Sequence, residues 1–186
     1  MHIFTKMKKE LYQKIEIPEG VEVNIEGPKI TVKGKEGELK KKFNLGKLEF
    51  KLEGKEIIIG NKKATKNEKK MMNTIASHVK NLIQGVQKKF EYNLKIVSSH
   101  FPMIVDIQKN KAVIKNFLGE KIPREARIPE GVVIESTKDS ITIKSMDKEL
   151  AGQAAANFEK STRVTSRDRR VFQDGIFITG KAGVEM

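Results

Sequence analysis

Apolar and polar side chains alternate over much of the first third of the chain. Apolar residues occupy every second position at 21–25, 30–32 and 48–52, and further strands are expected at 39–43 and 57–59. A period of two residues is typical of strands that bury one face and expose the other. Gly27-Pro28 and several single glycines lie between these segments as turns. The pattern predicts an antiparallel sheet.

The period then changes to three and four residues. Apolar residues recur at Met72, Ile75, Val79, Leu82, Ile83 and Val86, which is the spacing of one face of an α-helix. Thr65 followed by Glu68 forms a capping box at the start, and the opposite face is polar. These features predict a helix of about five turns that covers one face of the sheet.

Alternation returns after this helix. Strands are expected at 90–96, 103–107 and 112–117, followed by a hairpin and by a second, alanine-rich helix from near Asp147 through Phe158.

A repeat at an offset of 111 residues relates the two halves of the chain. IPEGV at 17–21 returns at 128–132, ITVK at 30–33 returns as ITIK at 141–144, and EL at 38–39 returns at 149–150. Three matches in one ungapped register indicate an internal duplication. The second helix follows its hairpin directly, whereas the first follows two further strands, so the repeats have either diverged or are permuted.

The predicted fold class is therefore α+β, with two similar domains related by internal duplication, each an antiparallel sheet with a helix packed on one face. The domains are expected at 1–86 and 87–186, the second with a basic C-terminal extension. No flexible Ser/Gly linker lies near 85–89, which indicates a stiff connection.

The charge of the chain favours a polyanionic partner. Lys and Arg number 37 against 24 Asp and Glu, which gives a net charge of +13, and a field of this size attracts nucleic acid or an anionic membrane. No apolar run approaches the ~20 residues of a spanning helix, and the N-terminus lacks the apolar region of a signal peptide. With no cysteine, a disulfide framework is excluded. These features predict a cytoplasmic protein and no membrane partner.

The cations of the second half concentrate near its end. Residues 90–159 balance ten cations with ten anions, whereas residues 160–181 carry six cations against two anions, a net of +4. The six cations are Lys160, Arg163, Arg167, Arg169, Arg170 and Lys181. Arginine forks fit phosphate oxygens, which predicts a phosphate-binding stretch, with a merely solvated loop as the alternative. Residues 1–89 carry +10, so composition alone would place the polyanion on the first domain.

Two loops of the second half place a Phe among hydrogen-bonding residues. The first loop contains Ser99, His100 and Phe101, and the second contains Asn116, Phe117 and Lys121. Aromatic rings beside cations can stack on exposed bases. For Phe117 the favoured alternative is that it ends a strand in the core, whereas for Phe101 the functional and the purely structural interpretation are equally open. His100 is interpreted as a hydrogen-bonding residue, because His2 and His78 offer no metal-ligand spacing.

Catalytic chemistry finds no support in the sequence. Neither usual glycine-rich phosphate loop occurs, nor HExxH, nor GxSxG. We expect no enzyme, no catalytic residue, no metal and no cofactor.

Several motifs resemble one known family. RVFQDGIFITGK at 170–181 follows the alanine-rich helix, and SHFPM at 99–103 and NFLGEK at 116–121 precede it in the same order as the family blocks. Together with the duplicated IPEGV units, these motifs resemble the ribosomal large-subunit L-six family in its archaeal and eukaryotic form. Phe177 stands where relatives often have Tyr, a departure that costs at most one hydroxyl contact.

The resemblance implies a two-domain ribosomal protein that binds large-subunit ribosomal RNA, chiefly through the second domain, near the sarcin-ricin loop where translational GTPases dock. Neighbouring ribosomal proteins are further implied partners, and the RNA-facing blocks are 99–103, 116–121 and 163–181. Our hypothesis is that Arg163, Arg167, Arg169 and Arg170 contact phosphates while Asp174-Gly175 forms the turn that aims them. Two alternatives are a basic adaptor for an acidic protein and an enzyme acting on RNA.

Overall fold

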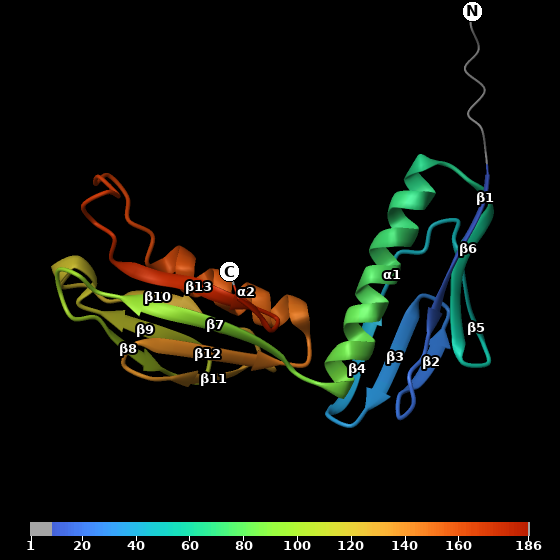
Figure 1. The fold of residues 1–186 in the computed structure, drawn as a ribbon, viewed down its shortest axis with the longest axis horizontal. Helices are drawn as coiled ribbons and strands as arrows, with labels where there is room; N and C mark the ends of the chain where they lie inside the picture. Colours follow the sequence, from blue (N-terminus) through green and yellow to red (C-terminus); the bar gives the residue numbers. More distant parts are fainter. Residues whose placement is uncertain (1–8, 186) are drawn as a thin grey trace, which may run out of the picture. The chain divides into compact units, whose positions relative to one another are not determined.

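The computed structural model describes residues 9–185, and the chain divides into two compact units after Lys88. Unit 1 ends at Lys88 and unit 2 begins at Lys89. The expected boundary was after Val86, within the last turn of α1 (Lys66–Gln87), and the two compact units divide after that helix, at Lys88. Each unit has antiparallel sheets, one long helix and its own core (Figure 1), which confirms the predicted α+β class with two similar domains.

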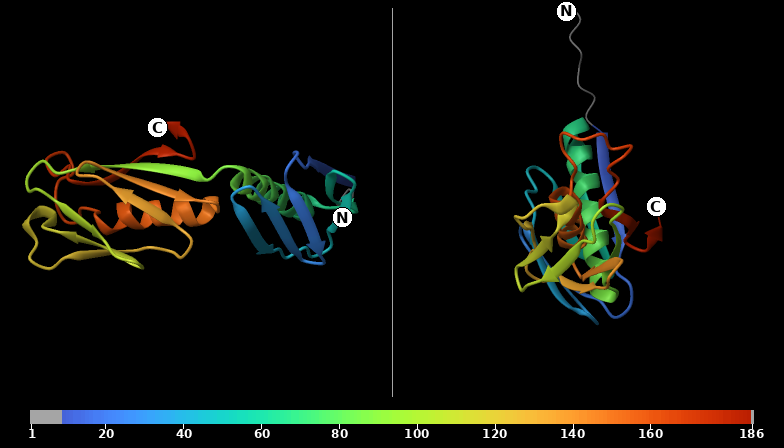
Figure 2. Two further views of the ribbon diagram at one scale, coloured as in Figure 1. Left: turned by 90° about the horizontal axis from the view of Figure 1, so that it is seen from below. Right: turned by 90° about the vertical axis from the view of Figure 1, so that its left-hand side faces the viewer.

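Six strands lie beside α1 in the described part of unit 1. They are β1 (Lys9–Glu16), β2 (Glu22–Glu26), β3 (Lys29–Gly34), β4 (Gly37–Lys42), β5 (Glu49–Glu53) and β6 (Glu56–Ala64). The strands form two antiparallel sheets with the orders β1-β6-β5 and β2-β3-β4. α1 lies on one side of them (Figure 2) and contacts both sheets. The sequence predicted one antiparallel sheet for this domain, whereas the structure has two three-stranded sheets packed against one helix.

The start of α1 confirms the predicted capping box. The backbone N–H of Thr65 donates to the Glu68 carboxylate at 2.8 Å, and the Thr65 hydroxyl contacts the same carboxylate. These bonds satisfy polar groups that a helix end leaves unpaired. β1 lies mostly outside the predicted strands. Its inward side carries the polar Gln13, whose Oε1 is buried without a hydrogen-bond partner, and this residue interrupts the apolar alternation.

Unit 2 contains eight strands in its described part. They are β7 (Phe90–Val97), β8 (Ile104–Ile107), β9 (Lys111–Lys115), β10 (Arg124–Arg127), β11 (Val133–Ser136), β12 (Ser140–Ser145), β13 (Gly175–Lys181) and β14 (Val184–Glu185). The sheets have the orders β10-β9-β8 and β11-β12-β7-β13-β14. A short 3-10 helix, η1 (Phe117–Gly119), follows β9, and α2 (Lys148–Ser161) follows β12.

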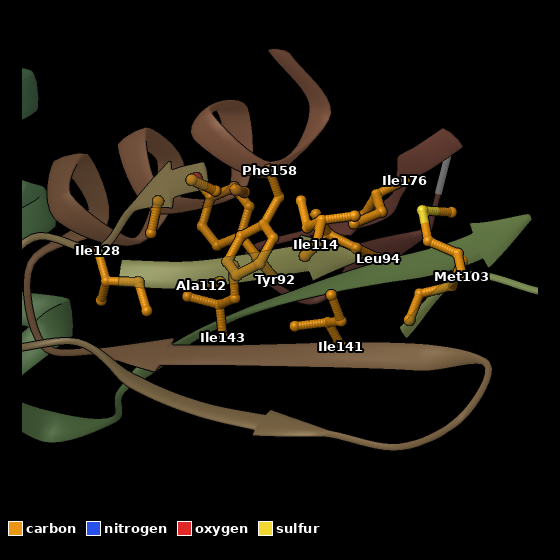
Figure 3. Packing of buried hydrophobic residues seen from close by; sticks show 14 of the residues in the cluster. Tyr92, Leu94, Met103, Ala112, Ile114, Ile128, Ile141, Ile143, Phe158 and Ile176 are labelled. Carbon is orange, nitrogen blue, oxygen red and sulfur yellow. The ribbon is translucent and has the colours of Figure 1, made fainter. Parts of the chain in front are cut away.

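The core of unit 2 lies between α2 and the strands (Figure 3). Ala151, Ala154 and Ala155 are fully buried, so α2 approaches the sheets closely, and Phe158 projects from the helix into the core. Ile176 of β13 belongs to this core with 1% of its surface exposed. The sequence predicted a basic extension here, but its last part is a strand inside the five-stranded sheet.

Equivalent backbone contacts show how the two repeats correspond. The IPEGV turns have the same left-handed glycine, with φ of +83° at Gly20 and +82° at Gly131. Ile17 N donates to the Lys55 carbonyl at 2.9 Å, and Ile128 N donates to the Asn110 carbonyl at 3.0 Å. The strands before and after these turns therefore match, β1 with β10, β2 with β11 and β3 with β12.

The strand orders show that the repeats are permuted. The sheet β1-β6-β5 matches β10-β9-β8, and β2-β3-β4 matches β11-β12-β7. In unit 1 the strands β4, β5 and β6 come after the shared hairpin, whereas in unit 2 their counterparts β7, β8 and β9 come before it. The match of EL at 38–39 with EL at 149–150 is not a structural equivalence, because residues 38–39 lie in β4 and residues 149–150 lie in α2.

Candidate nucleic-acid interface

The basic segment predicted from the sequence forms an irregular connection from α2 to β13. It is the red loop that leads into β13 in Figure 1. The side chains of Lys160, Arg163, Arg167, Arg169 and Arg170 are all exposed, and within residues 9–185 none of them forms a salt bridge. Asp168 shapes the segment: its carboxylate accepts from Arg170 N at 2.9 Å, and its carbonyl accepts from Phe172 N at 2.9 Å. The four arginines therefore stand on this folded connection, and Lys160 stands on the last turn of α2, without salt bridges in the described residues.

Asp174 joins this segment to the loop at 99–103. Its carboxylate is 2% exposed and accepts from Ser99 N at 2.6 Å, from His100 N at 3.0 Å and from His100 Nδ1 at 2.5 Å. Burial would raise the pKa of this carboxyl, but the His100 backbone and ring and the Ser99 N–H outweigh it and hold the pKa below its ordinary value. Asp174 is therefore a buried anion that positions the loop and presents no charge to a ligand.

A stack of three side chains strengthens this junction. The rings of His100 and Phe172 lie 4.9 Å apart at 23°, and the Arg167 guanidinium lies 4.8 Å from the Phe172 ring. Such a contact holds a guanidinium near an aromatic face without neutralising it. Phe172 thus fixes the position of Arg167 relative to the first loop.

The loop at 116–121 is tied to the same place. Asn116 Nδ2 donates to the Pro102 carbonyl at 2.9 Å, and Phe101, which is 48% exposed, lies against Gly119. Asn116 and Leu118 have positive φ values of 59° and 50°, which is unusual for residues other than glycine. The local backbone is held in this shape by its surroundings.

Phe117 requires a correction. It is a predicted RNA-stacking residue, but its side chain is 1% exposed and belongs to the core of unit 2. Its ring lies 4.3 Å from the Arg124 guanidinium. Phe117 therefore anchors the loop from below, and the aromatic ring that the loops expose is that of Phe101.

Arg124 is a residue that the sequence analysis missed. Its guanidinium donates to both Glu120 carboxylate oxygens at 2.8 and 2.6 Å, and to the carbonyls of Ser161 at 3.0 Å and Arg163 at 3.1 Å. The hydrogen bonds and charge of Arg124, together with the charge of Arg167, hold the pKa of Glu120 below its ordinary value. Arg124 thus connects the second loop to the start of the basic segment. The only signal in the sequence was the i,i+4 spacing of Glu120 and Arg124.

A groove of about 670 Å³ runs along the basic segment between the end of α2 and β13. Its lining includes Lys160, Arg163, Arg169, Phe172, Gln173 and Phe177. The structure therefore brings together the two loops and five of the six predicted cations. Lys181 is the exception, because it pairs with Tyr92 at the opposite end of β13 from Gly175, about 20 Å away at strand spacing. Lys121 is exposed on the second loop.

Other site types find no support in residues 9–185. No group of three or more His, Cys, Asp or Glu side chains there is arranged to hold a metal ion. None of the described helices has the length and apolar character needed to cross a membrane.

Comparison with known proteins identifies the relatives of the chain. The family model for ribosomal protein L6 matches residues 17–89 and 101–175. "Large ribosomal subunit protein uL6" of Methanothrix thermoacetophila is 44% identical over 175 residues, which cover 94% of this chain and 99% of that protein. The uL6 proteins of Methanococcus vannielii and Sulfurisphaera tokodaii are each 41% identical, over 92% of this chain and 94% and 92% of their own lengths. The chain therefore belongs to the ribosomal protein L6 family.

Proposed function

We propose that this protein is a structural constituent of the large ribosomal subunit and binds large-subunit ribosomal RNA mainly through unit 2. The relatives named above are large-subunit proteins of archaea, and the family is a non-enzymatic component of the ribosome. The place of action is the ribosome in the cytoplasm, with ribosomal RNA and neighbouring ribosomal proteins as partners. The family resemblance favours a position near the sarcin-ricin loop, beside the docking region of translational GTPases.

One observation carries the assignment to unit 2. Two loops and the basic segment, which are distant in sequence, meet near the buried Asp174 and leave four exposed arginines that form no salt bridge in the described chain. RNA structure is recognised largely through phosphates and shape. Arginines held at fixed separations suit that task, because their spacing selects a particular arrangement of phosphates.

The role of each part follows from its contacts. Arg163, Arg167, Arg169 and Arg170 contact phosphates, and the exposed Phe101 stacks on an unpaired base or packs against a ribose. Asp174 and Arg124 position these groups without touching RNA. Because the loops are already ordered in the folded protein, less conformational entropy is lost when RNA binds.

The test is binding to a large-subunit RNA fragment that contains the sarcin-ricin stem, titrated across salt. The triple variant Arg167→Ala/Arg169→Ala/Arg170→Ala should lower the log-log salt slope by roughly two to three units, at about 0.7–0.9 per phosphate contact. Lys109→Ala/Arg127→Ala/Lys138→Ala removes three exposed cations elsewhere in unit 2 and serves as the control. Equal slopes for the two variants would refute the assignment to this segment. Little affinity of the parent protein for RNA would favour an acidic protein partner.

A further inference from the structure

The most basic part of the chain is not the segment described above. Residues 62–89 carry eight lysines and a single acidic residue, Glu68, a net of +7. This stretch comprises the end of β6, α1 and the two lysines that follow it. Most of the +10 carried by residues 1–89 therefore lies on one helix and its flanks, rather than being scattered over the strands.

The cations of α1 stand on or beside its solvent-facing side. Met72, Val79 and Val86 are among the buried residues of the helix, whereas Lys66, Lys69, Lys70, Asn73, Ser77, Lys80 and Gln84 are exposed. We call the seven exposed residues the α1 basic face. In the part of the chain that the structure describes, its four lysines pair with no carboxylate. Glu68 offers no compensation, because the capping box engages its carboxylate at Thr65.

The lysines at the start of α1 oppose the stability of the helix. Lys66, Lys69 and Lys70 lie in the first two turns, where the helix dipole favours anions, and the last turn carries no basic residue. Lys66 and Lys70 are also like charges at i,i+4, a pairing that destabilises a helix. A local arrangement that opposes stability is expected mainly where function requires it.

The second helix provides an internal comparison. α2 packs on its sheets in the same protein with Lys148 and Lys160 balanced by Glu149 and Glu159. A neutral helix therefore suffices for this type of core, and the charge of α1 is a property of its exposed face alone.

We propose that the α1 basic face is a second RNA-binding surface, which binds the phosphodiester backbone of structured RNA. This goes beyond the function proposed above, which places RNA contacts on unit 2. α1 has 22 residues and is about 33 Å long at 1.5 Å per residue. A helix of this size does not enter the deep, narrow major groove of A-form RNA, so it lies across phosphate ridges and the shallow minor groove.

The chemistry of the face fits this partner. Lysine ammonium groups bind phosphates as point charges without demanding one geometry, and Asn73, Ser77 and Gln84 supply neutral hydrogen-bonding groups suited to ribose hydroxyls and phosphate oxygens. An anionic membrane does not fit, because the apolar side of α1 is already buried in the core of unit 1 and has nothing to insert.

The test uses the full chain with Lys66→Gln/Lys69→Gln/Lys70→Gln/Lys80→Gln. Gln keeps the helix propensity of Lys, and loss of the like-charge repulsion should leave the melting temperature equal or higher. The control Lys14→Gln/Lys35→Gln/Lys51→Gln/Lys55→Gln removes four exposed lysines from elsewhere in unit 1. Binding to transcribed large-subunit ribosomal RNA across salt should lose roughly two to three units of slope in the first variant, and at most about one unit in the control.

A second readout is lysine acetylation of the parent protein with and without that RNA. The four lysines of the α1 basic face should become protected, whereas Lys35 and Lys55, which are exposed elsewhere in unit 1, stay reactive. Protection that requires intact ribosomal subunits and does not occur with RNA alone would identify a protein partner and overturn the proposal. So would equal slopes for the two lysine variants. Because the arginine variant of unit 2 is measured on the same RNA, failure of this surface is distinguishable from failure of the unit 2 site.

Discussion

Replacing Asp174 tests whether the interface of unit 2 is built around one buried anion. Asp174→Ala removes the acceptor of three hydrogen bonds from Ser99 and His100. Hydrogen bonds to a charged group contribute about 1.5–3 kcal/mol each, but Ser99 and His100 lie at the surface, where water partly replaces the lost acceptor. We therefore expect unit 2 to lose about 3 kcal/mol, near the lower end for breaking a buried ion pair.

The measurement is thermal unfolding followed by calorimetry. At about 4–8 °C per kcal/mol for a domain of this size, the transition of unit 2 should fall by about 12–24 °C. Asp168→Ala is the control, since Asp168 is exposed and accepts one backbone bond from Arg170, and it should cost about 1 kcal/mol or less. A melting temperature for Asp174→Ala within a few degrees of the parent would show that the loops are held by other contacts.

The pH dependence gives an independent check of the same reasoning. The pKa of Asp174 is lowered in the folded protein, so its contribution is complete above the unfolded value of about 3.9 and is lost as pH falls through the lower folded value. The stability difference between the parent and Asp174→Asn should therefore be constant near neutral pH and shrink below about pH 4. A difference that persists unchanged in acid would mean that the carboxylate charge contributes nothing.

Two further predictions separate residues that support the interface from residues that contact RNA. Phe117→Ala should destabilise unit 2 by about 3–5 kcal/mol in denaturant unfolding, as for other buried Phe residues. Phe101→Ala should cost about 1 kcal/mol or less and should weaken RNA binding instead. The reverse result would contradict the burial of Phe117. Arg124→Lys keeps the charge, but its three N–H donors on one nitrogen cannot reproduce the four bonds that the planar guanidinium makes. Amide exchange at 116–121 should therefore accelerate, and unchanged exchange would show that Arg124 does not position this loop.

The elements of the fold were predictable wherever the sequence pattern is local. The helix at 66–87 was recognised from its apolar spacing and capping box, and both the duplication and the two-domain α+β architecture were recognised from IPEGV and ITVK. β1 was missed because Gln13 occupies an inward position where an apolar residue was expected. The correspondence of β4 with β7 was missed because permutation moves it out of any single ungapped register.

The interface was predictable in its residue types but not in its assembly. Arginine density and the motifs indicated which segments to examine, whereas the contacts of Asp174 with Ser99 join residues 75 positions apart. Phe117 and Phe101 occur in similar sequence surroundings, and only the packing of β9 and η1 decides that one is buried and the other exposed. Two of the four hydrogen bonds of Arg124 go to backbone carbonyls, which every residue possesses, so the sequence marks only its i,i+4 partner Glu120.

The two units carry different surfaces because the helix occupies a different place in the strand order of each. In unit 2 the helix follows β12, and the chain after it returns as β13 to pair with β7, so the connection from α2 to β13 lies beside the loop that follows β7. Asp174, at the end of that connection, can therefore bond Ser99 and His100. In unit 1 the helix follows β6, and no strand of unit 1 follows it, so this loop junction has no counterpart there. The charge lies instead on the helix itself. The two units thus share similar cores, and their cations gather on loops in unit 2 and along the helix in unit 1.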